Sequence, residues 1–337
     1  MTFEIVHSLP KLIWRRYVDQ HPGGNIFHTP EMYDVFSRGG SYQPRLWAVV
    51  DGQYNPLVLL LPVILTLKGG VFRYFTSRAV VYGSVLFNPN SEGVKELRNL
   101  LVQYTKENHS RLLFTELRNM ADLSDVQNIL NRQKFVYEDH LNYLVDLDLS
   151  PDAVFKNIGQ RTRKNIRRGL NKGKVVIKQV TERNEIVRCY CLLKQTYQAV
   201  QVPLADISLF ESAFDILYPK GMIRFSLALL GDKVAATSID LIYKDVIYGW
   251  YGGTDRKFAN YVPNEILTWS ILKWGAENGF RVYDFGGAGK PEEAYGVREF
   301  KAKFGGRLVN YGRNTYVHTP KRLELSKIGY KFMRRWL

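Results

Sequence analysis

Cysteine is almost absent from this sequence of 337 residues, which contains only Cys189 and Cys191. The two lie in one helical stretch, too close to pair comfortably, and no second Cys/His pair stands at zinc-ligand spacing. These absences exclude a disulfide framework. We expect two reduced thiols and no bound metal.

Long apolar runs are also scarce. The longest, residues 57–67, is broken by Pro62 and is predicted to form a long strand. A membrane-spanning helix needs roughly 20 apolar residues. The first 16 residues mix Glu4, His7 and Pro10 with apolar residues and lack the order of a secretion signal. We therefore expect a soluble, cytoplasmic protein.

Acidic residues are outnumbered by basic ones, 32 to 47, which gives a net charge of +15. This balance favours polyanionic partners such as RNA, nucleotide-linked substrates or an anionic membrane surface. A solvated basic surface without a partner is the alternative. With 45% hydrophobic residues the chain can bury large cores, and its length suits two domains of about 100–200 residues each.

Two stretches of the first half return in the second half in the same order. RLWAVVDGQ at 45–53 resembles RFSLALLGDK at 224–233, and VQYTKENHSRLLF at 102–114 resembles LKWGAENGFRVYD at 272–284. The shared order predicts a duplicated domain, although common hairpin and helix–strand patterns also match by chance. Each copy mixes antiparallel hairpins with one helical crossover, which fits a mixed sheet flanked by helices.

The two copies are predicted to meet near Ser150, which with Pro151 and Asp152 has the pattern of a helix start. A long strand at 135–147 would then close the first copy. We expect an α/β (α+β) fold with an N-terminal domain at 1–148, a C-terminal catalytic domain at 149–318 and a basic amphipathic helix at 319–337.

Residues 264–307 are predicted to form a helix, a short strand, a glycine-rich loop at 286–290 and a second helix. Such a loop places polar side chains at the carboxyl edge of a sheet, where ligands bind in open α/β folds. Asp284 ends the strand, and Lys301 on the next helix can reach back over the edge. We predict that this edge is an active centre, and the resemblance of residues 252–306 to a family of N-acyl and aminoacyl transferases implies that its chemistry is acyl transfer to an amine.

Acyl transfer to an amine needs a neutral amine, an acceptor for its proton and stabilisation of the tetrahedral oxyanion. No Ser-His-Asp or Cys-His arrangement suggests a covalent intermediate, so direct attack is the simpler proposal. Lys301 is the candidate for binding the oxyanion or a donor phosphate; the alternative is a solvated helix lysine. Asp284 is the candidate for positioning or deprotonating the amine; the alternative is a strand-end aspartate that accepts hydrogen bonds from the loop.

Further candidates for substrate contact lie in or near this stretch. Phe300 and Phe304 stand at helical spacing, which is more typical of a core than of a ligand platform. Tyr295 and Arg298 lie close to Lys301 and are equally ordinary as a surface pair. The predicted substrate-binding set is Tyr295, Arg298, Phe300, Tyr261, Asn264 and Arg38.

Residues 161–174 contain seven basic residues and no acidic residue. On a helix, Lys164, Arg167 and Arg168 share one face, where they can bind phosphates or RNA. A solvated charged face is the alternative. The tail, 321–337, repeats this basic character beside an apolar stripe of Leu325, Ile328, Phe332 and Trp336. That stripe can lie on an anionic membrane surface or pack against the body of the protein.

Three segments resemble the FemABX family of peptidoglycan-bridge aminoacyltransferases, which consist of tandem GCN5-related N-acetyltransferase (GNAT) domains. They are GGTDRKFANYVPNEILTWSILKWGAENGFRVYDFGG at 252–287, YGVREFKAKFGG at 295–306 and RTRKNIRRGLNKG at 161–173. The resemblance implies transfer of an amino acid from aminoacyl-tRNA to an amine on a cell-wall precursor. It also implies that Lys301 occupies the place of a family lysine that serves the tRNA end or the reacting carbonyl.

The resemblance points to the compact branch of the family, since no coiled-coil arm interrupts the second domain. In that branch, basic residues on an early helix and on the helix before the second hairpin hold the phosphates of a nucleotide sugar. Here residues 33–36 and 209–212 lack such bases, and only Arg38 is near. A muramyl-peptide substrate is therefore in doubt, although the chemistry is not.

Acetyl-CoA-dependent GNAT enzymes hold pyrophosphate with the backbone of an Arg/Gln-x-x-Gly-x-Gly/Ala loop. In the loop at 252–263 only Arg256 matches, and Ala259 and Tyr261 carry side chains where the backbone should approach closely. The pattern argues against a normal CoA site. No cofactor is expected, and the co-substrate is aminoacyl-tRNA or acyl-CoA.

Two other functions stay open. One is a CoA- or carrier-dependent N-acyltransferase that acts on an amino sugar in surface-polysaccharide synthesis. The other is a non-catalytic RNA- or membrane-binding protein on the same fold. The expected partners are a phosphate-bearing acyl donor and a nucleotide- or lipid-linked cell-envelope precursor, with the inner face of the membrane as a further site of peripheral association.

Overall fold

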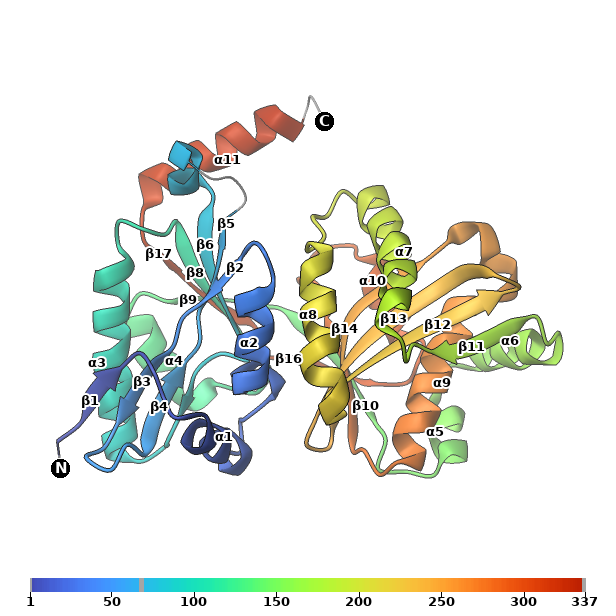
Figure 1. Cartoon of the computed structure of the whole chain (residues 1–337), viewed down its shortest axis with the longest axis horizontal. Coiled ribbons are helices and arrows are strands. Elements are labelled where there is room, and N and C mark those ends of the chain that lie inside the picture. The colour runs from blue at the N-terminus through green and yellow to red at the C-terminus, as the bar shows by residue number, and fades with distance from the viewer. Residues whose placement is uncertain (1, 67–69, 335–337) are drawn as a thin grey trace. The chain divides into compact units, whose positions relative to one another are not determined.

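The computed structural model describes residues 2–66 and 70–334, and their side chains except at 71, 72 and 330–334 (Figure 1). The chain divides into two units, residues 1–139 with 311–337 and residues 140–310. No helix among the described residues has the length and apolar character needed to cross a membrane.

The first unit contains both the beginning and the end of the chain. Its helices are α1 (Lys11–Gln20), α2 (Pro30–Arg38), α3 (Ser91–Asn108), α4 (Ser124–Arg132) and α11 (Pro320–Arg334), with short 3₁₀ segments η1 (Ile26–His28) and η2 (Gly70–Phe75). Its strands are β1 (Glu4–Val6), β2 (Tyr42–Pro44), β3 (Trp47–Val50), β4 (Pro56–Leu60), β5 (Val63–Thr66), β6 (Ser77–Tyr82), β7 (Leu86–Phe87), β8 (Phe114–Arg118), β9 (Val136–Glu138) and β17 (Arg313–Val317). They form two sheets, ordered β1-β3-β4-β7 and β2-β5-β6-β8-β17-β9.

The single strand predicted at 57–67 is wrong. β4 ends at Leu60 and β5 begins at Val63, and the two strands belong to different sheets. Pro62 lies in the break. Because proline has no N–H to donate to a strand ladder, it favours the point where the chain leaves one sheet for the other.

The second unit is one seven-stranded sheet covered by helices. Its helices are α5 (Pro151–Asn157), α6 (Gln160–Asn171), α7 (Ile186–Ala199), α8 (Ile207–Leu217), α9 (Pro263–Glu277) and α10 (Gly296–Ala302), with 3₁₀ segments η3 (Arg183–Glu185), η4 (Tyr218–Lys220) and η5 (Arg256–Tyr261). Its strands are β10 (Leu141–Asp146), β11 (Val175–Gln179), β12 (Ile223–Leu230), β13 (Lys233–Tyr243), β14 (Val246–Thr254), β15 (Val282–Gly287) and β16 (Arg307–Asn310). The strand order is β11-β12-β13-β14-β15-β10-β16.

Helix α9 supplies the core on one face of this sheet. Its residues Leu267, Ile271 and Leu272 pack with Tyr283 and Phe285 of β15. Helices α7 and α8 cover the other face, as Figure 1 shows. The core therefore fixes β15, the strand that leads into the glycine-rich loop.

The two units repeat one arrangement. β6, α3 and β8 form a strand–helix–strand crossover with parallel pairing, and β14, α9 and β15 form the same crossover in the second unit. The predicted mixed sheets flanked by helices are confirmed.

Each unit also receives a strand from the far half of the chain. β17 lies between β8 and β9, and β10 lies between β15 and β16, in each case antiparallel to both neighbours. This exchange explains why the observed boundaries differ from the predicted 148/149 and 318/319. The strand predicted at 135–147 is divided into β9 and β10, and β17 belongs to the first unit. Ser150 caps α5 as predicted, with its hydroxyl accepting from the Ala153 N–H, but the units change before it.

Candidate active site

The glycine-rich loop begins where β15 ends. Gly286 has φ +68° and Gly289 has φ +76°, conformations that favour glycine. A Cβ on Gly286 would also lie 3.1 Å from the Tyr248 hydroxyl. The turn exposes a row of backbone carbonyls on its inner side, from Phe285 to Gly287, and these define the site's geometry.

Lys301, in the last turn of α10, extends its side chain into this row of carbonyls. Its Nζ donates to the carbonyl oxygens of Phe285 (2.5 Å), Gly286 (3.0 Å) and Gly287 (2.8 Å). The residue is only 8% exposed, and burial lowers the pKa of Lys301 to about 8, opposed by the nearby Asp284 charge. An ammonium has three N–H donors. All three are engaged, so Lys301 is a buried charge that organises the loop and not a solvated helix lysine.

Asp284 is buried beneath the same loop. One of its carboxylate oxygens accepts hydrogen bonds from the Gly286 N–H (2.7 Å) and from Asn142 Nδ2 on β10 (2.7 Å). Burial raises the pKa of Asp284, and these hydrogen bonds oppose the rise. The geometry matches the second of the two expected roles, an aspartate that accepts hydrogen bonds from the loop. Sequence reasoning missed Asn142, whose signal is an amide inside an apolar strand.

The residues predicted around Lys301 have mostly structural contacts. The Arg298 guanidinium donates to the backbone carbonyls of Lys290 (2.7 Å), Pro291 (2.9 Å) and Glu293, so it closes the loop. Phe300 packs into the apolar core that contains Phe304, whose ring centre lies 5.2 Å away. This packing favours the core role of Phe300 over that of a ligand platform, and its contact with substrate stays a prediction. Tyr295 is 40% exposed and lies against Gly289, which leaves it available at the surface of the loop.

Tyr261 and Asn264 lie at the junction between η5 and α9, where helix α6 packs. A Cβ on Gly169 of α6 would meet the Ile266 side chain at 2.7 Å and the Tyr261 carbonyl at 3.3 Å, so glycine permits this close approach. The Lys174 ammonium lies 5.6 Å from the centre of the Tyr261 ring. Packing therefore brings the basic segment next to the start of α9.

The basic helix α6 presents its charges outward. Thr162, Ile166 and Gly169 form its buried face, whereas Lys164, Arg167 and Arg168 are exposed. The Arg167 guanidinium lies 5.1 Å from the Phe155 ring centre, and Arg168 donates to the Asn165 amide oxygen (3.3 Å). Within the described part of the chain no acidic side chain forms an ion pair with these three bases. The predicted shared face is confirmed; phosphate binding by it stays a prediction.

Comparisons with known proteins agree with this architecture. A family model described as an acetyltransferase (GNAT) domain matches residues 159–301. A lipid II:glycine glycyltransferase of Staphylococcus haemolyticus is 25% identical over 229 residues, which cover 66% of this chain and 48% of that protein. The match thus spans about half the length of that relative. A protein of the same name from Staphylococcus epidermidis is 20% identical over 368 residues, covering 86% of each chain.

Two solved structures have the same fold. The crystal structure of FemX has a TM-score of 0.72 at 16% identity and covers 93% of this chain and 97% of its own. A tandem GNAT protein from the clavulanic acid biosynthesis pathway has a TM-score of 0.61 at 11% identity, covering 95% and 99%. The chain is therefore similar in sequence and in fold to proteins of the FemABX family. The predicted tandem GNAT fold is confirmed, and the names of the relatives agree with the predicted acyltransferase class.

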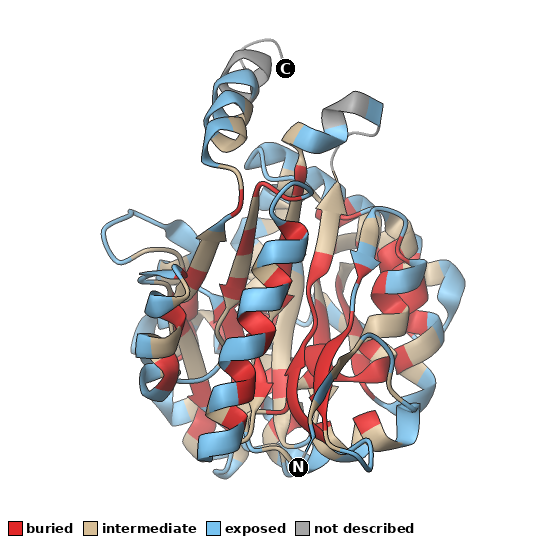
Figure 2. Cartoon of the chain, turned by 90° about the vertical axis from the view of Figure 1, so that its left-hand side faces the viewer, coloured by how far each residue is buried: buried red, intermediate tan, exposed pale blue. Residues whose placement is uncertain are grey.

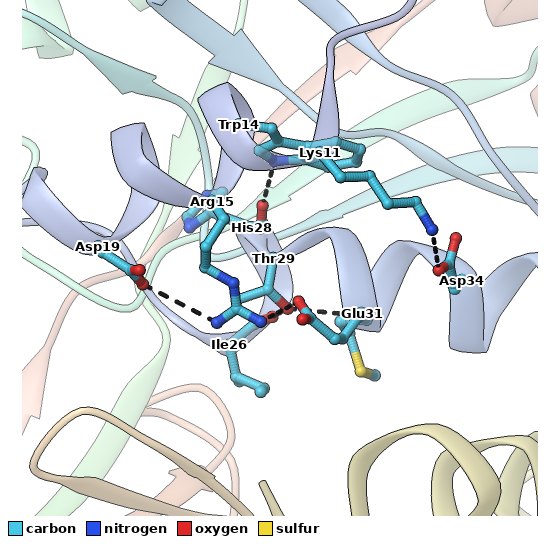
Figure 3. Close-up of polar contacts among 10 residues, drawn as sticks. Lys11, Trp14, Arg15, Asp19, Ile26, His28, Thr29, Glu31 and Asp34 are labelled. Atoms are coloured by element: carbon cyan, nitrogen blue, oxygen red, sulfur yellow. Dashed lines mark hydrogen bonds and ion pairs between the residues drawn. The ribbon is translucent and has the colours of Figure 1, made fainter. Parts of the chain in front are cut away.

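The early helix α2 lacks bases for the phosphates of a nucleotide sugar apart from Arg38, and the acids that it carries pair with bases of α1. Lys11 on α1 pairs with Asp34 on α2 (2.5 Å), and Arg15 pairs with Glu31, as Figure 3 shows. Two of the three bases of α1 are therefore paired with acids of α2, and Arg16 is exposed. Arg38 is exposed at the end of α2 and belongs to the first unit, whereas Lys301 belongs to the second.

Sequence reasoning also missed a buried polar cluster of the second unit. Asp240 of β13 is fully buried and accepts hydrogen bonds from the Tyr283 hydroxyl (3.0 Å) and the Ser238 hydroxyl (2.9 Å). Tyr283 reaches across β14 because Gly249 has no side chain; a Cβ there would lie 2.8 Å from the tyrosine hydroxyl. Burial raises the pKa of Asp240 to about 7. An aspartate inside an apolar strand was the available signal.

The Asp240 cluster predicts a pH-dependent stability. Because the folded-state pKa of Asp240 is above its ordinary value of 3.8, folding takes up a proton between about pH 4 and pH 7. Its contribution to stability is thus lost as the pH rises through this window. Asp240→Asn is the neutral reference: its amide oxygen can accept from the Tyr283 hydroxyl, while its N–H groups face the Ser238 hydroxyl. Relative to this variant, the wild type should lose about 2–4 kcal/mol of unfolding free energy between pH 4.5 and pH 8. Urea denaturation of both proteins measures this; a difference that does not change with pH would contradict it.

Proposed function

We propose that this protein transfers an aminoacyl group from aminoacyl-tRNA to a primary amine of a lipid-linked cell-envelope precursor, at the edge formed by β15 and Lys301. The observation that carries the proposal is the buried Lys301 ammonium at the carboxyl edge of the second sheet. A fixed positive charge in a dry site stabilises developing negative charge far better than one in water.

The reaction is a direct displacement. The neutral acceptor nitrogen attacks the carbonyl carbon of the aminoacyl ester, and negative charge develops on the carbonyl oxygen. The C–O bond to the ribose of the tRNA then breaks, an amide forms, and the proton from the nitrogen passes to the departing ribose oxygen. Lys301 stabilises the oxyanion through its charge; for direct contact, one N–H donor exchanges its carbonyl partner for the oxyanion.

Asp284 has a positioning role in this account. With its hydrogen bonds from Asn142 and the Gly286 N–H it fixes the loop that surrounds the ammonium. Its burial, at 4% exposure, separates it from an amine in solution. Lys301 and Asp284 thus act together on the loop, with Lys301 also supplying the charge.

The tRNA donor is supported by the basic helix α6 beside the start of α9. The exposed bases suit a phosphate backbone. The segment expected to hold pyrophosphate in a CoA-dependent enzyme forms the 3₁₀ turn η5, with side chains at Ala259 and Tyr261. Val262, which follows it, has φ +50°, an unusual conformation for a β-branched residue. This segment is therefore not an open glycine loop.

The lipid-linked acceptor is supported by the relatives, which are named lipid II:glycine glycyltransferases. The ion pairs of Lys11 and Arg15 agree with it, because they occupy two of the bases that could otherwise meet the phosphates of a nucleotide sugar. The acceptor amine then belongs to a precursor that is held in a bilayer.

A donor assay tests the proposal. The purified protein is incubated with a lipid-linked precursor that carries a free amine, and either with a mixture of aminoacyl-tRNAs or with acetyl-CoA. Mass spectrometry detects the amide, and a thiol reagent detects released CoA. We expect an amide that depends on tRNA. Thiol release with an acetylated product would favour the CoA-dependent alternative, and stable tRNA binding without any amide would favour a non-catalytic protein.

Helix α6 gives a separate prediction. Replacing Lys164, Arg167 and Arg168 by glutamine should weaken tRNA binding and reduce the slope of log K against log salt by about 2–3, because each phosphate contact contributes about 0.7–0.9. Filter binding at several salt concentrations measures both. The control replaces three exposed bases of α3, Lys95, Arg98 and Lys106, by glutamine. Equal losses in the two variants would show that net charge, and not α6, binds the tRNA.

A further inference from the structure

Helix α11 carries an exposed apolar strip. Leu325 and Ile328 are 58% and 52% exposed, and their spacing of three places them on one face. In Figure 2 the helix stands beyond the ends of the strands, with exposed residues in blue. The other members of the predicted stripe, Phe332 and Trp336, lie outside the residues whose side chains the structure describes. Leu325 and Ile328 do not pack against the first unit, contrary to one of the two expectations.

The opposite side of α11 is firmly attached. The Ser326 hydroxyl donates to the Phe75 carbonyl of η2 (2.6 Å), and Arg322 donates to the Ser110 carbonyl (2.8 Å). The preceding strand β17 is paired on both edges within the first unit. The helix is therefore held in one orientation, which keeps the Leu325 and Ile328 side pointing outward.

The neighbourhood of this strip is strongly basic. Residues 320–334 contain five basic residues and one acidic residue, Glu324, which pairs with Lys327. On η2, Tyr74 is 42% exposed, and the guanidinium groups of Arg73 and Arg322 lie 5.1 and 6.0 Å from its ring centre. An aromatic ring with an apolar body and a polar end, beside cations and aliphatic side chains, suits a membrane interface.

We propose that this surface docks the protein on an anionic lipid bilayer. The α11–η2 surface consists of Arg73, Tyr74, Lys321, Leu325 and Ile328. Its aliphatic side chains enter the boundary between headgroups and acyl chains, and its bases lie at the level of the lipid phosphates. The lipid occupant is favoured over two others: RNA would leave the aliphatic side chains in water, and a second copy of α11 would bring like charges together.

The benefit of docking rests on the proposed function, because membrane contact helps a transferase only if its acceptor is held in the bilayer. The docking itself is independent of turnover. It concentrates the protein at the surface where the acceptor lies, so activity on a membrane-embedded acceptor should depend on the α11–η2 surface. Activity on a short-chain, water-soluble acceptor should not.

Vesicle sedimentation of the full chain tests the proposal. The vesicles contain phosphatidylcholine alone or phosphatidylcholine with phosphatidylglycerol, and we expect binding to the anionic vesicles that weakens with salt. Leu325→Gln with Ile328→Gln should lower the partition coefficient about tenfold or more. The matched control, Leu12→Gln with Val102→Gln, removes two other exposed apolar side chains of the first unit and should change it little. Thermal unfolding verifies that each variant is folded.

The charges provide a second arm. Replacing Arg73 and Lys321 by glutamine should weaken anionic vesicle binding roughly fivefold per residue. The proposal would be overturned if both α11–η2 variants partitioned like the wild type, or if the wild type bound neutral and anionic vesicles equally. It would also be overturned if the variants lost RNA binding while vesicle binding stayed unchanged. If wild-type vesicle binding is present while no acceptor is aminoacylated, the docking inference stands and the proposed function fails.

Discussion

Lys301→Met should lower kcat for aminoacyl transfer by about 10²–10³-fold, the loss typical of removing one group that stabilises an oxyanion. Methionine keeps an unbranched side chain in the cradle but removes the charge that the carbonyls of Phe285, Gly286 and Gly287 surround. The affinity for tRNA should change little, because α6 supplies the phosphate contacts. Steady-state kinetics together with filter binding separates the two quantities.

Two controls accompany this variant. Lys303→Met removes an exposed lysine two residues away and should retain kcat within about threefold, as is usual for surface substitutions. The pH dependence gives the second: the wild-type rate should fall above about pH 8, where the Lys301 ammonium loses its proton. A Lys301→Met enzyme with wild-type kcat would remove Lys301 from the chemistry.

Gly305→Ala should lower the free energy of unfolding by about 3 kcal/mol or more. Gly305 follows α10 with φ +73°, and a Cβ there would lie 2.0 Å from the Asn157 backbone oxygen. A backbone oxygen cannot move aside as a side chain can. Either α10 or the end of α5 must therefore shift, and a shift of α10 would withdraw Lys301 from its carbonyls. Urea denaturation measures the stability, and poor soluble expression would be consistent with a larger loss.

Gly279→Ala is the matched control. Gly279 has a nearly equal φ of +75°, but a Cβ there would meet nothing within 4 Å. Only the cost of the left-handed conformation applies, about 1–2 kcal/mol. If the two alanine variants lost the same free energy of unfolding, the predicted clash with the Asn157 backbone would be contradicted.

The sequence predicted local features well where a short pattern determines them. Ser150 followed by Pro151 marks the start of α5, and the glycines near 286–289 mark a loop with positive φ. The duplicated crossover was also accessible, because each copy retains a helix–strand pattern. These features depend on neighbouring residues and on backbone sterics, which a single sequence displays directly.

The exchange of β10 and β17 between the units could not be predicted from local sequence patterns. Both strands are short segments of mixed polarity, LNYLVD and RNTYV, and their partners lie more than a hundred residues away. Strand pairing at that separation depends on side-chain packing across the sheet, which periodicity does not reveal. The predicted boundaries followed the helix cap at Ser150 and therefore missed the strand exchange.

The candidate site shows the same division. Lys301 and Asp284 were identified from their place beside the loop, but their contacts were not: residue type does not tell whether an ammonium points outward or toward buried carbonyls. Arg298 and Phe300 share the helix of Lys301, yet one closes the loop and the other joins the core. Asn142 and Asp240 are polar residues inside mainly apolar strands, and this feature could have indicated the buried polar clusters.

A single-turnover experiment follows the transfer step itself and shows whether Lys301 acts in it. Excess protein is mixed with aminoacyl-tRNA labelled in the amino acid and with the lipid-linked acceptor, and the label is followed over time from ester to amide. The account predicts complete transfer by the wild type and a transfer rate lower by about 10²–10³-fold for Lys301→Met. Label that remains on the tRNA with the wild type, or equal rates for the two proteins, would contradict it.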